Sequence, residues 1–257
     1  MLVTGATQGI GREVALRLAA EGAAVGLVAR RRDVLEDVAR QASTAGAAGV
    51  AIVSADLSRP GEPDAAVASI AADLGGLDAL VNNVGAARQV SVDELGDDDW
   101  ERSFQVNVMS CVRTTRAALP HLRASDQARI VNVASTAGKR PSGSLPDYSV
   151  MKAAVLSFSR LIADAEVKHG VLVNAVAPGP TATPAWIADG GLADQAAARG
   201  GGTREEALAK TGAGRPIGRL AEPEEIADVI VFLCSARVSY VTGAAWGVDG
   251  GTVPVII

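Results

Sequence analysis

Cysteine, histidine and aromatic residues are scarce in this chain of 257 residues. Its two cysteines, Cys111 and Cys234, lie far apart in the sequence and make no disulfide framework. Two buried thiols in a reduced, cytoplasmic compartment are the simpler expectation. His121 and His169 are the only histidines, and they form no clustered Cys/His spacing. The sequence therefore predicts neither a zinc site nor any other metal site.

An excess of positive charge and long apolar runs are also missing. The net charge is −5 and the pI is about 5.1, which argues against nucleic acid as the main partner, because phosphate binding requires a basic patch. No apolar run reaches the length that spans a membrane, and the N-terminus lacks the basic region and cleavage site of a signal peptide. The chain is nevertheless 48% hydrophobic, enough for a substantial core.

Short apolar runs alternate with stretches of helical spacing along the chain. The apolar runs predict about seven strands, at 1–5, 23–29, 49–56, 77–85, 128–135, 171–179 and 240–251. The helical stretches are 9–21, 33–45, 62–74, 97–124 (with a break expected near Pro120), 147–169 and 222–236. This alternation predicts an α/β fold: a Rossmann-type, doubly wound parallel sheet with helices on both faces, in a single domain over 1–257. The Gly- and Ala-rich stretch 180–214 interrupts the alternation, and we expect a mobile substrate flap at about 183–214.

A glycine-rich loop, "TGATQGIG", follows the first apolar run and opens the first predicted helix. Its three glycines allow a tight turn and let backbone N–H groups approach phosphate oxygens, and the helix N-terminus adds partial positive charge. A merely structural turn is the alternative, because many strand-to-helix turns contain glycine. The predicted dinucleotide-binding residues of this loop are Gly5, Thr7, Gln8, Gly9, Ile10 and Gly11.

The end of the second predicted strand, "LVARRRD", indicates which cofactor is bound. An acidic residue at this place would hydrogen-bond the ribose 2′-hydroxyl of NAD, whereas arginine accommodates the 2′-phosphate of NADP. The position holds Ala29, and Arg30 and Arg31 follow. We therefore predict that NADP(H) is preferred, with NAD(H) as the alternative. A solvated charged turn is the other interpretation of Arg31 and Arg32.

Further motifs follow the glycine loop in order: "NNVG" (82–85), Asn107 in "FQVNVMS", Ser135 in "IVNVAS", "YSVMK" (148–152) and "NAVAPG" (174–179). In this order and spacing the chain resembles the short-chain dehydrogenase/reductase family over nearly its whole length. Its C-terminal part resembles the 3-oxoacyl-carrier-protein reductase-like members. No single motif is decisive, but their combination leaves little room for coincidence.

The resemblance implies a catalytic role for four residues. Tyr148 is the expected general acid that protonates the carbonyl oxygen as hydride arrives, and the base in the oxidative direction. Lys152, one helical turn further on, is expected to hold the nicotinamide ribose and to lower the pKa of Tyr148. Ser135 is expected to hydrogen-bond the carbonyl oxygen. Asn107 is expected to hold a water that links Lys152 to solvent, or else to be a structural amide satisfied by the backbone.

The resemblance also implies cofactor contacts from loops at the ends of later strands. Asn83 and Gly85 are expected beside the adenosine ribose, although the family more often has alanine where this chain has Val84. Asp56 and Leu57 are expected at the adenine ring, with a cap for the following turn as the alternative role of Asp56.

Three more cofactor contacts are implied after the sixth predicted strand. Pro178, Gly179 and Thr183 are expected to flank the nicotinamide, with Thr183 at its carboxamide, whereas a strand-terminating turn is the structural alternative. The family usually has several residues before the first strand, whereas this chain begins within it. We therefore expect the first strand to be less well packed.

The motifs predict the reaction class and leave the substrate open. We expect reduction of a ketone, either a 3-oxoacyl thioester or another hydrophobic carbonyl compound, that is a small molecule or is bound to a carrier. Lys139 and Arg140 would attract an anionic or carrier-bound substrate, or are exposed turn charges. An apolar lid is expected from Trp186, Ile187 and Leu192.

The resemblance implies a homotetramer, or a homodimer, formed through the helices at 97–124 and 147–169, and the apolar end "TVPVII" suits a partner surface. Two other functions stay open. A catalytically silent NADP(H)-binding sensor would have no need of Ser135, Tyr148 and Lys152 together. A sugar-nucleotide epimerase or dehydratase would usually carry a longer C-terminal domain.

Overall fold

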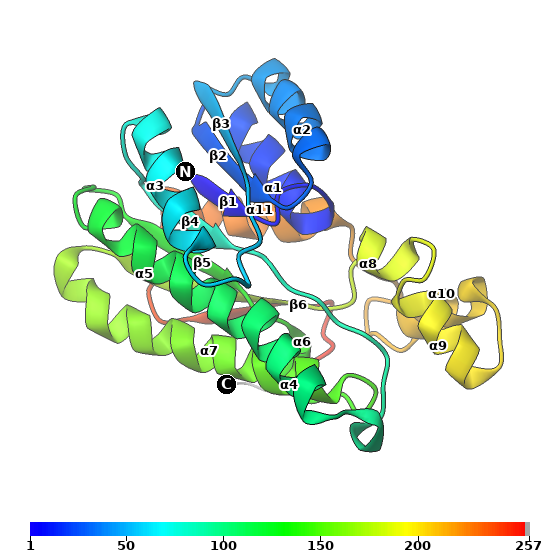
Figure 1. Ribbon diagram of the computed structural model, residues 1–257. Helices are drawn as coiled ribbons and strands as arrows, with labels where there is room; N and C mark the ends of the chain where they lie inside the picture. The colour runs from blue at the N-terminus through cyan, green and yellow to red at the C-terminus, as the bar shows by residue number, and fades with distance from the viewer. Residues whose placement is uncertain (255–257) are drawn as a thin grey trace.

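The computed structural model describes residues 1–254 and has one parallel sheet at its centre. The strand order in this sheet is β3-β2-β1-β4-β5-β6-β7 (Figure 1). The chain winds outward from β1 to β3, returns to the middle, and then winds outward from β4 to β7, which confirms the doubly wound, Rossmann-type prediction. The strands are β1 (Leu2–Thr4), β2 (Ala24–Ala29), β3 (Gly49–Ser54), β4 (Ala79–Asn82), β5 (Arg129–Val133), β6 (Leu172–Pro178) and β7 (Ala245–Val248).

Helices cover both faces of the sheet (Figure 1). One face carries α1 (Gly9–Ala20), α2 (Arg32–Ala45) and α11 (Pro223–Cys234). The other carries α3 (Glu62–Leu74), α5 (Ser110–Leu122) and α7 (Pro146–Glu166). Successive strand residues point to opposite faces, so Leu2 joins the core on the α3 side and Val3 joins the core on the α1 side. Two buried faces explain why the strands read as continuous apolar runs.

The first strand is better packed than expected. Leu2 and Val3 are both 0% exposed, because β1 lies between β2 and β4 in the middle of the sheet. The terminal amine of Met1 donates a 2.7 Å hydrogen bond to the Ala24 carbonyl. The prediction of weaker packing at this strand is wrong.

The helix predicted over 97–124 is divided at a different place from the one expected. It consists of α4 (Asp97–Phe104), a π-helical turn η2 (Gln105–Met109) and α5. Pro120 lies within the last turn of α5, so the break predicted there is wrong. The π-helical turn contains Asn107, and such turns frequently mark functional sites.

The stretch predicted as a flap forms three short helices beside the carboxyl ends of the strands (Figure 1). They are α8 (Pro184–Ile187), α9 (Leu192–Gly200) and α10 (Arg204–Ala213), and we call 183–214 the cap. The Arg204 guanidinium at the start of α10 forms 2.6 Å ion pairs with Asp189, between α8 and α9, and with Asp194 of α9. These ion pairs connect the helices of the cap.

The remaining short elements are η1 (Val92–Glu94), α6 (Thr136–Lys139) and η3 (Val167–His169). Cys111 and Cys234 are free and buried, as expected. Among residues 1–254, no helix combines the length and the apolar character needed to cross a membrane.

Candidate active site

A cavity of about 1470 Å³ opens at the carboxyl ends of the strands, beneath the cap. This is the edge at which open α/β sheets bind their ligands. The structure brings most of the predicted site residues together there, with Gly11 and Asn107 as the exceptions. Those that line the cavity are Gly5, Thr7, Gln8, Gly9, Ile10, Arg30, Arg31, Asp56, Leu57, Asn83, Gly85, Ser135, Tyr148, Lys152, Pro178, Gly179 and Thr183.

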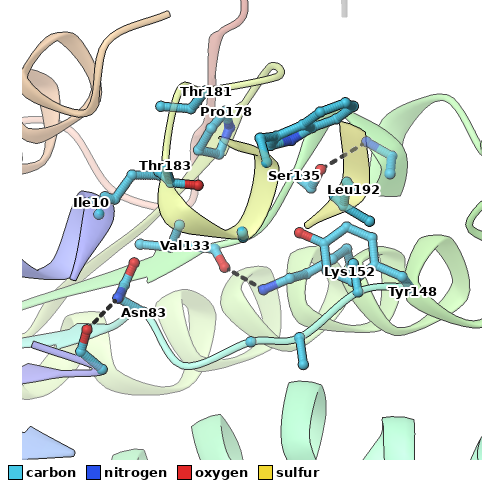
Figure 2. A pocket seen from close by; sticks show the side chains of 18 of the residues that line it. Ile10, Asn83, Val133, Ser135, Tyr148, Lys152, Pro178, Thr181, Thr183 and Leu192 are labelled. Atoms are coloured by element: carbon cyan, nitrogen blue, oxygen red, sulfur yellow. Dashed lines mark hydrogen bonds between the residues drawn. The ribbon is translucent and has the colours of Figure 1, made fainter. Parts of the chain in front are cut away.

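Ser135, Tyr148 and Lys152 face one another within this cavity (Figure 2). Ser135 follows β5 and caps α6, where its Oγ accepts a 3.1 Å hydrogen bond from the Ala137 N–H. Tyr148 and Lys152 come from the first turns of α7, and the ammonium nitrogen lies 5.6 Å from the centre of the phenol ring. The same ammonium donates a 2.8 Å hydrogen bond to the Val133 carbonyl oxygen. The end of β5 therefore positions both the serine and the lysine.

Burial shifts the pKa values of this pair in opposite directions. Lys152 is 3% exposed, and desolvation lowers its pKa to about 8. Desolvation of the Tyr148 hydroxyl raises its pKa above the ordinary value, and a hydrogen bond with Ser135 acts in the opposite direction. The pKa of Tyr148 is therefore higher than its ordinary value, where the sequence predicted a lowered one, because desolvation is the largest effect on the phenol. Near neutral pH the phenol carries its proton, which suits a proton donor.

Asn107 makes the backbone hydrogen bonds of its alternative, structural role, and the water relay stays a prediction. Its side chain is buried; Oδ1 accepts a 3.0 Å hydrogen bond from the Ala86 N–H, and Nδ2 donates to the Ala86 carbonyl at 3.0 Å and to the Ser103 carbonyl at 3.1 Å. The neighbouring Gly85 has little free space. A Cβ at that position would lie 3.1 Å from both Asn107 Oδ1 and Lys152 Nζ. Asn107 thus holds the chain that forms the cavity wall beside Lys152.

The glycine loop is held in place by the side chain of Asn83, which directly follows β4. Asn83 Nδ2 donates hydrogen bonds to the Thr4 carbonyl at 3.1 Å and the Gly5 carbonyl at 3.3 Å. Gly9 has a positive φ of 52°, and a Cβ there would lie 2.9 Å from Thr183 Cγ2. A Cβ at Gly11 would collide with the Gly5 carbonyl oxygen and the Asn83 amide, so this glycine allows the loop to pack and does not face the cavity.

The first turn of α1 and the end of β2 fit a phosphate-bearing dinucleotide. Gln8 at the N-cap makes no side-chain capping hydrogen bond, which leaves the first amides of α1 available to phosphate oxygens. Arg30 and Arg31 both line this part of the cavity, and the Arg31 guanidinium donates a 3.3 Å hydrogen bond to Gln8 Oε1. Ala29 supplies no carboxylate that would repel a 2′-phosphate.

Asp56 makes the contacts of the turn cap that was its alternative role, and its contact with the adenine ring stays a prediction. Its Oδ1 accepts hydrogen bonds from the Ser58 N–H at 3.1 Å and the Ser58 hydroxyl at 2.7 Å, as a cap of the following turn does. The hydroxyl contact is the main reason that the pKa of Asp56 lies below its usual value. Asp56 and Leu57 also line the cavity.

On the substrate side of the cavity, the structure differs from the predictions for Ile187 and Lys139. Trp186 and Leu192 of the cap line it, whereas Ile187 does not and is 42% exposed. Arg140 lines it as well, whereas the Lys139 ammonium turns away and donates a 2.8 Å hydrogen bond to the Ala245 carbonyl. Of the segment "TVPVII", the last three residues lie outside the described part.

Sequence reasoning missed three further contributors to the site. The Val133 carbonyl that holds Lys152 has no sequence signal, because every residue carries a carbonyl. Gly138 lets α6 rest on α7, since a Cβ there would lie 2.6 Å from the Lys152 carbonyl carbon; a glycine three positions after Ser135 was the available signal. Arg215 lines the cavity from beyond α10, and only the fold brings it there.

Comparisons with known proteins agree with this geometry. A family model described as "Enoyl-(Acyl carrier protein) reductase" matches residues 5–253. YvrD, an uncharacterized oxidoreductase of Bacillus subtilis (strain 168), is 37% identical over 254 residues, which cover 98% of this chain and 95% of that protein. D-beta-hydroxybutyrate dehydrogenase of Cupriavidus necator is 33% identical over 259 residues, covering 98% of this chain and 96% of that protein. The crystal structure of L-sorbose reductase from Gluconobacter frateurii, complexed with NADPH and L-sorbose, has a TM-score of 0.92 and 36% identity, covering 99% of this chain and 96% of that one.

Proposed function

Because the chain belongs to the short-chain dehydrogenase/reductase family of oxidoreductases, we propose that it is an NADP(H)-dependent ketoreductase that reduces a ketone to a secondary alcohol. The single observation that carries this proposal is the meeting of Ser135, Tyr148 and Lys152 in the cavity that the glycine loop also lines. When bound, the reduced nicotinamide supplies a hydride to the carbonyl carbon. The protein supplies the proton and stabilises the developing charge on oxygen.

Each of the three side chains has a distinct part in the proposed reaction. Tyr148 keeps its proton at neutral pH, since its pKa lies above the ordinary tyrosine value of 10.0, and it gives that proton to the carbonyl oxygen. Ser135 donates a hydrogen bond to the same oxygen. Lys152, largely protonated below its pKa of about 8, places its positive charge beside the phenol and stabilises the phenolate that forms.

The proposed cofactor preference is supported by charge at the end of β2. Arg30 and Arg31 line the cavity where Ala29 takes the place of an acidic residue. The dinucleotide phosphates would be held by the first amides of α1 and the glycine loop, and the nicotinamide end by Pro178, Gly179 and Thr183. L-sorbose reductase, which binds NADPH, is similar to this chain over almost its whole length.

The substrate proposed is a ketone that fits under the apolar side chains of Trp186 and Leu192. A 3-oxoacyl thioester is one candidate, in keeping with the resemblance of the C-terminal part. The similarity to D-beta-hydroxybutyrate dehydrogenase supports a short oxo acid as another.

The test is the decrease in NADPH absorbance with a panel of ketones that includes 3-oxoacyl thioesters, oxo acids and sugars. We expect turnover with at least one ketone and a lower kcat/KM with NADH. Tight NADPH binding without turnover of any carbonyl compound would instead support the silent sensor. Turnover of a sugar nucleotide without net NADPH consumption would support an epimerase.

We also propose self-association into a homotetramer through exposed apolar side chains on the outer helices. On α7, Val150 and Leu161 are 53% and 63% exposed, and on α11 Phe232 is 44% exposed. Light scattering should give a mass of about four chains, and a monomer at all concentrations would contradict this proposal.

A further inference from the structure

The charge of the cavity is opposite to that of the protein. The chain has a net charge of −5, yet the cavity is lined by six basic residues and one acidic residue, Asp56. A charged recess with low-dielectric walls concentrates ligands of the opposite sign. The negatively charged phosphates of the proposed cofactor account for part of this excess of positive charge. The basic residues are Arg30, Arg31, Arg102, Arg140, Lys152 and Arg215.

Three of the six have no role in the proposed cofactor binding or proton transfer. Arg102 already has an acidic partner, since its guanidinium lies 3.0 Å from the Asp99 carboxylate, which also pairs with Arg88. Arg140 and Arg215 form no ion pair with an acidic side chain anywhere in the part of the chain that the structure describes. Both guanidinium groups are therefore available to an anion.

Arg140 and Arg215 reach the cavity from two elements that bound its substrate side. Arg140 ends α6, in the loop that connects Ser135 to Tyr148. Arg215 follows α10 at the end of the cap, and it is partly buried, with Nε donating a 3.2 Å hydrogen bond to the Thr211 carbonyl. That hydrogen bond orients the guanidinium and leaves its two terminal nitrogens free. The cap residues Trp186 and Leu192 line the same cavity.

We propose that the substrate carries an anionic group and that Arg140 and Arg215 bind it while the carbonyl lies at Tyr148. Arginine suits this role because its planar donor set pairs with carboxylate and phosphate oxygens in two parallel hydrogen bonds. The chemistry is shared by the carboxylate of a small oxo acid and the phosphates of a coenzyme A thioester. This inference rests on the proposed ketone reduction and specifies the class of ketone.

The experiment compares substrates that share the reacting ketone and differ in whether they carry an anionic group, with NADPH as the reductant. One pair is an oxo acid and its methyl ester, in a series of increasing chain length. The other pair is a 3-oxoacyl coenzyme A and the neutral N-acetylcysteamine thioester of the same acyl group. We expect the wild-type protein to favour the anionic member of one pair in kcat/KM by roughly tenfold or more. The pair that shows the preference identifies the source of the anion.

Arg140→Ala and Arg215→Ala should each remove roughly tenfold of kcat/KM for the anionic substrate and leave the neutral one unchanged. Arg140→Lys, which keeps the charge but loses the paired donors, should be intermediate. Lys139→Gln is the matched control, because that ammonium points out of the cavity, and it should leave the preference intact. The NADPH dissociation constant should not change in any of these variants.

Several outcomes would overturn the inference. Equal kcat/KM for the charged and neutral members, or a preference that survives in both arginine variants, would show that no anion is bound there. Weaker NADPH binding in Arg140→Ala or Arg215→Ala would assign that arginine to the cofactor instead. If no ketone is reduced, the proposed function fails separately, and calorimetric titration of the same oxo acids and coenzyme A thioesters into the protein with NADP⁺ still tests the arginines. Binding that is insensitive to both substitutions, or no binding, would then reject the anion site.

Discussion

The ammonium nitrogen of Lys152 lies 5.6 Å from the centre of the Tyr148 ring, and both side chains line one cavity. Burial lowers the pKa of the lysine to about 8 and raises that of the tyrosine. Near neutral pH the pair therefore holds one positive charge and one intact phenol. This is the protonation state that carbonyl reduction requires, because the proton to be donated is already in place.

Tyr148→Phe should lower kcat by about 10²–10⁴-fold, because it removes the proposed proton donor without changing the shape of the ring. The NADPH dissociation constant should stay close to the wild-type value. Tyr240→Phe is the matched control: it alters the only other tyrosine, which is 101% exposed, and should leave kcat unchanged. Loss of cofactor binding together with activity would instead indicate a structural role for Tyr148.

Lys152 should make both stability and activity depend on pH above neutrality. Its pKa falls from an ordinary 10.5 to about 8 in the folded protein, so between these values the unfolded chain binds the proton that the folded protein releases. The free energy of unfolding should therefore rise with pH through this window, and the full cost of burying the charge is present below it. The kcat/KM for reduction should fall as pH increases above about 8, where the free enzyme loses the ammonium.

Lys152→Met should remove that rise in stability and abolish activity. At neutral pH we expect it to increase the free energy of unfolding by roughly 1–2 kcal/mol, because the relief of desolvation exceeds the loss of the hydrogen bond to Val133. Urea denaturation at several pH values measures this. A variant less stable than the wild type near neutral pH, with the same pH dependence, would contradict the assigned burial cost.

Arg30→Ala and Arg31→Ala should each reduce kcat/KM with NADPH by roughly tenfold and change kcat/KM with NADH little, because only NADPH carries the 2′-phosphate. The matched control is Arg32→Ala, since Arg32 does not line the cavity and pairs with Glu36 at 2.9 Å. Initial rates measured with NADPH and with NADH give the two kcat/KM values for each variant. An equal loss with NADPH and NADH in the two test variants would place these arginines elsewhere than at the 2′-phosphate.

Gly138→Ala should destabilise the protein by about 1–3 kcal/mol and lower kcat, because the added methyl would lie 2.6 Å from the Lys152 carbonyl carbon and push α6 away from α7. Ser135, which caps α6, would move with it. Gly143→Ala is the control in the next loop, where no atom lies within 4 Å of the added carbon. Thermal unfolding and kcat should separate the two variants, and equal behaviour would argue against the close packing of α6 on α7.

Arg199→Ala should increase opening of the cap over 183–214. Two contacts join the cap to the segment after β4. They are an ion pair between Arg199 and Glu94 and a 2.7 Å hydrogen bond from the Gln89 N–H to Gln195 Oε1. Losing an exposed ion pair changes global stability little, so the melting temperature should stay constant while hydrogen exchange in the cap becomes faster.

Arg160→Ala, which removes an exposed pair with Asp164, should leave exchange in the cap unchanged. Unaltered exchange in the cap of Arg199→Ala would show that this ion pair does not hold it closed.

Local patterns were sufficient to predict the sheet and much of the site. Apolar runs and helical spacing gave the seven strands and the helices that cover them, because periodicity depends on neighbouring residues alone. The glycine loop and the four-residue spacing of Tyr148 and Lys152 are equally local. Most of the other predicted residues that line the cavity came from the resemblance to the family.

Only the tertiary structure decided the features that depend on distant segments meeting. It placed Arg215 beside the cavity, turned Lys139 away from it, and placed the helix break in the π-helical turn that contains Asn107. It also decided the sign of the pKa shift of Tyr148, because desolvation is produced by the whole surrounding chain and cannot be read from the lysine one turn away.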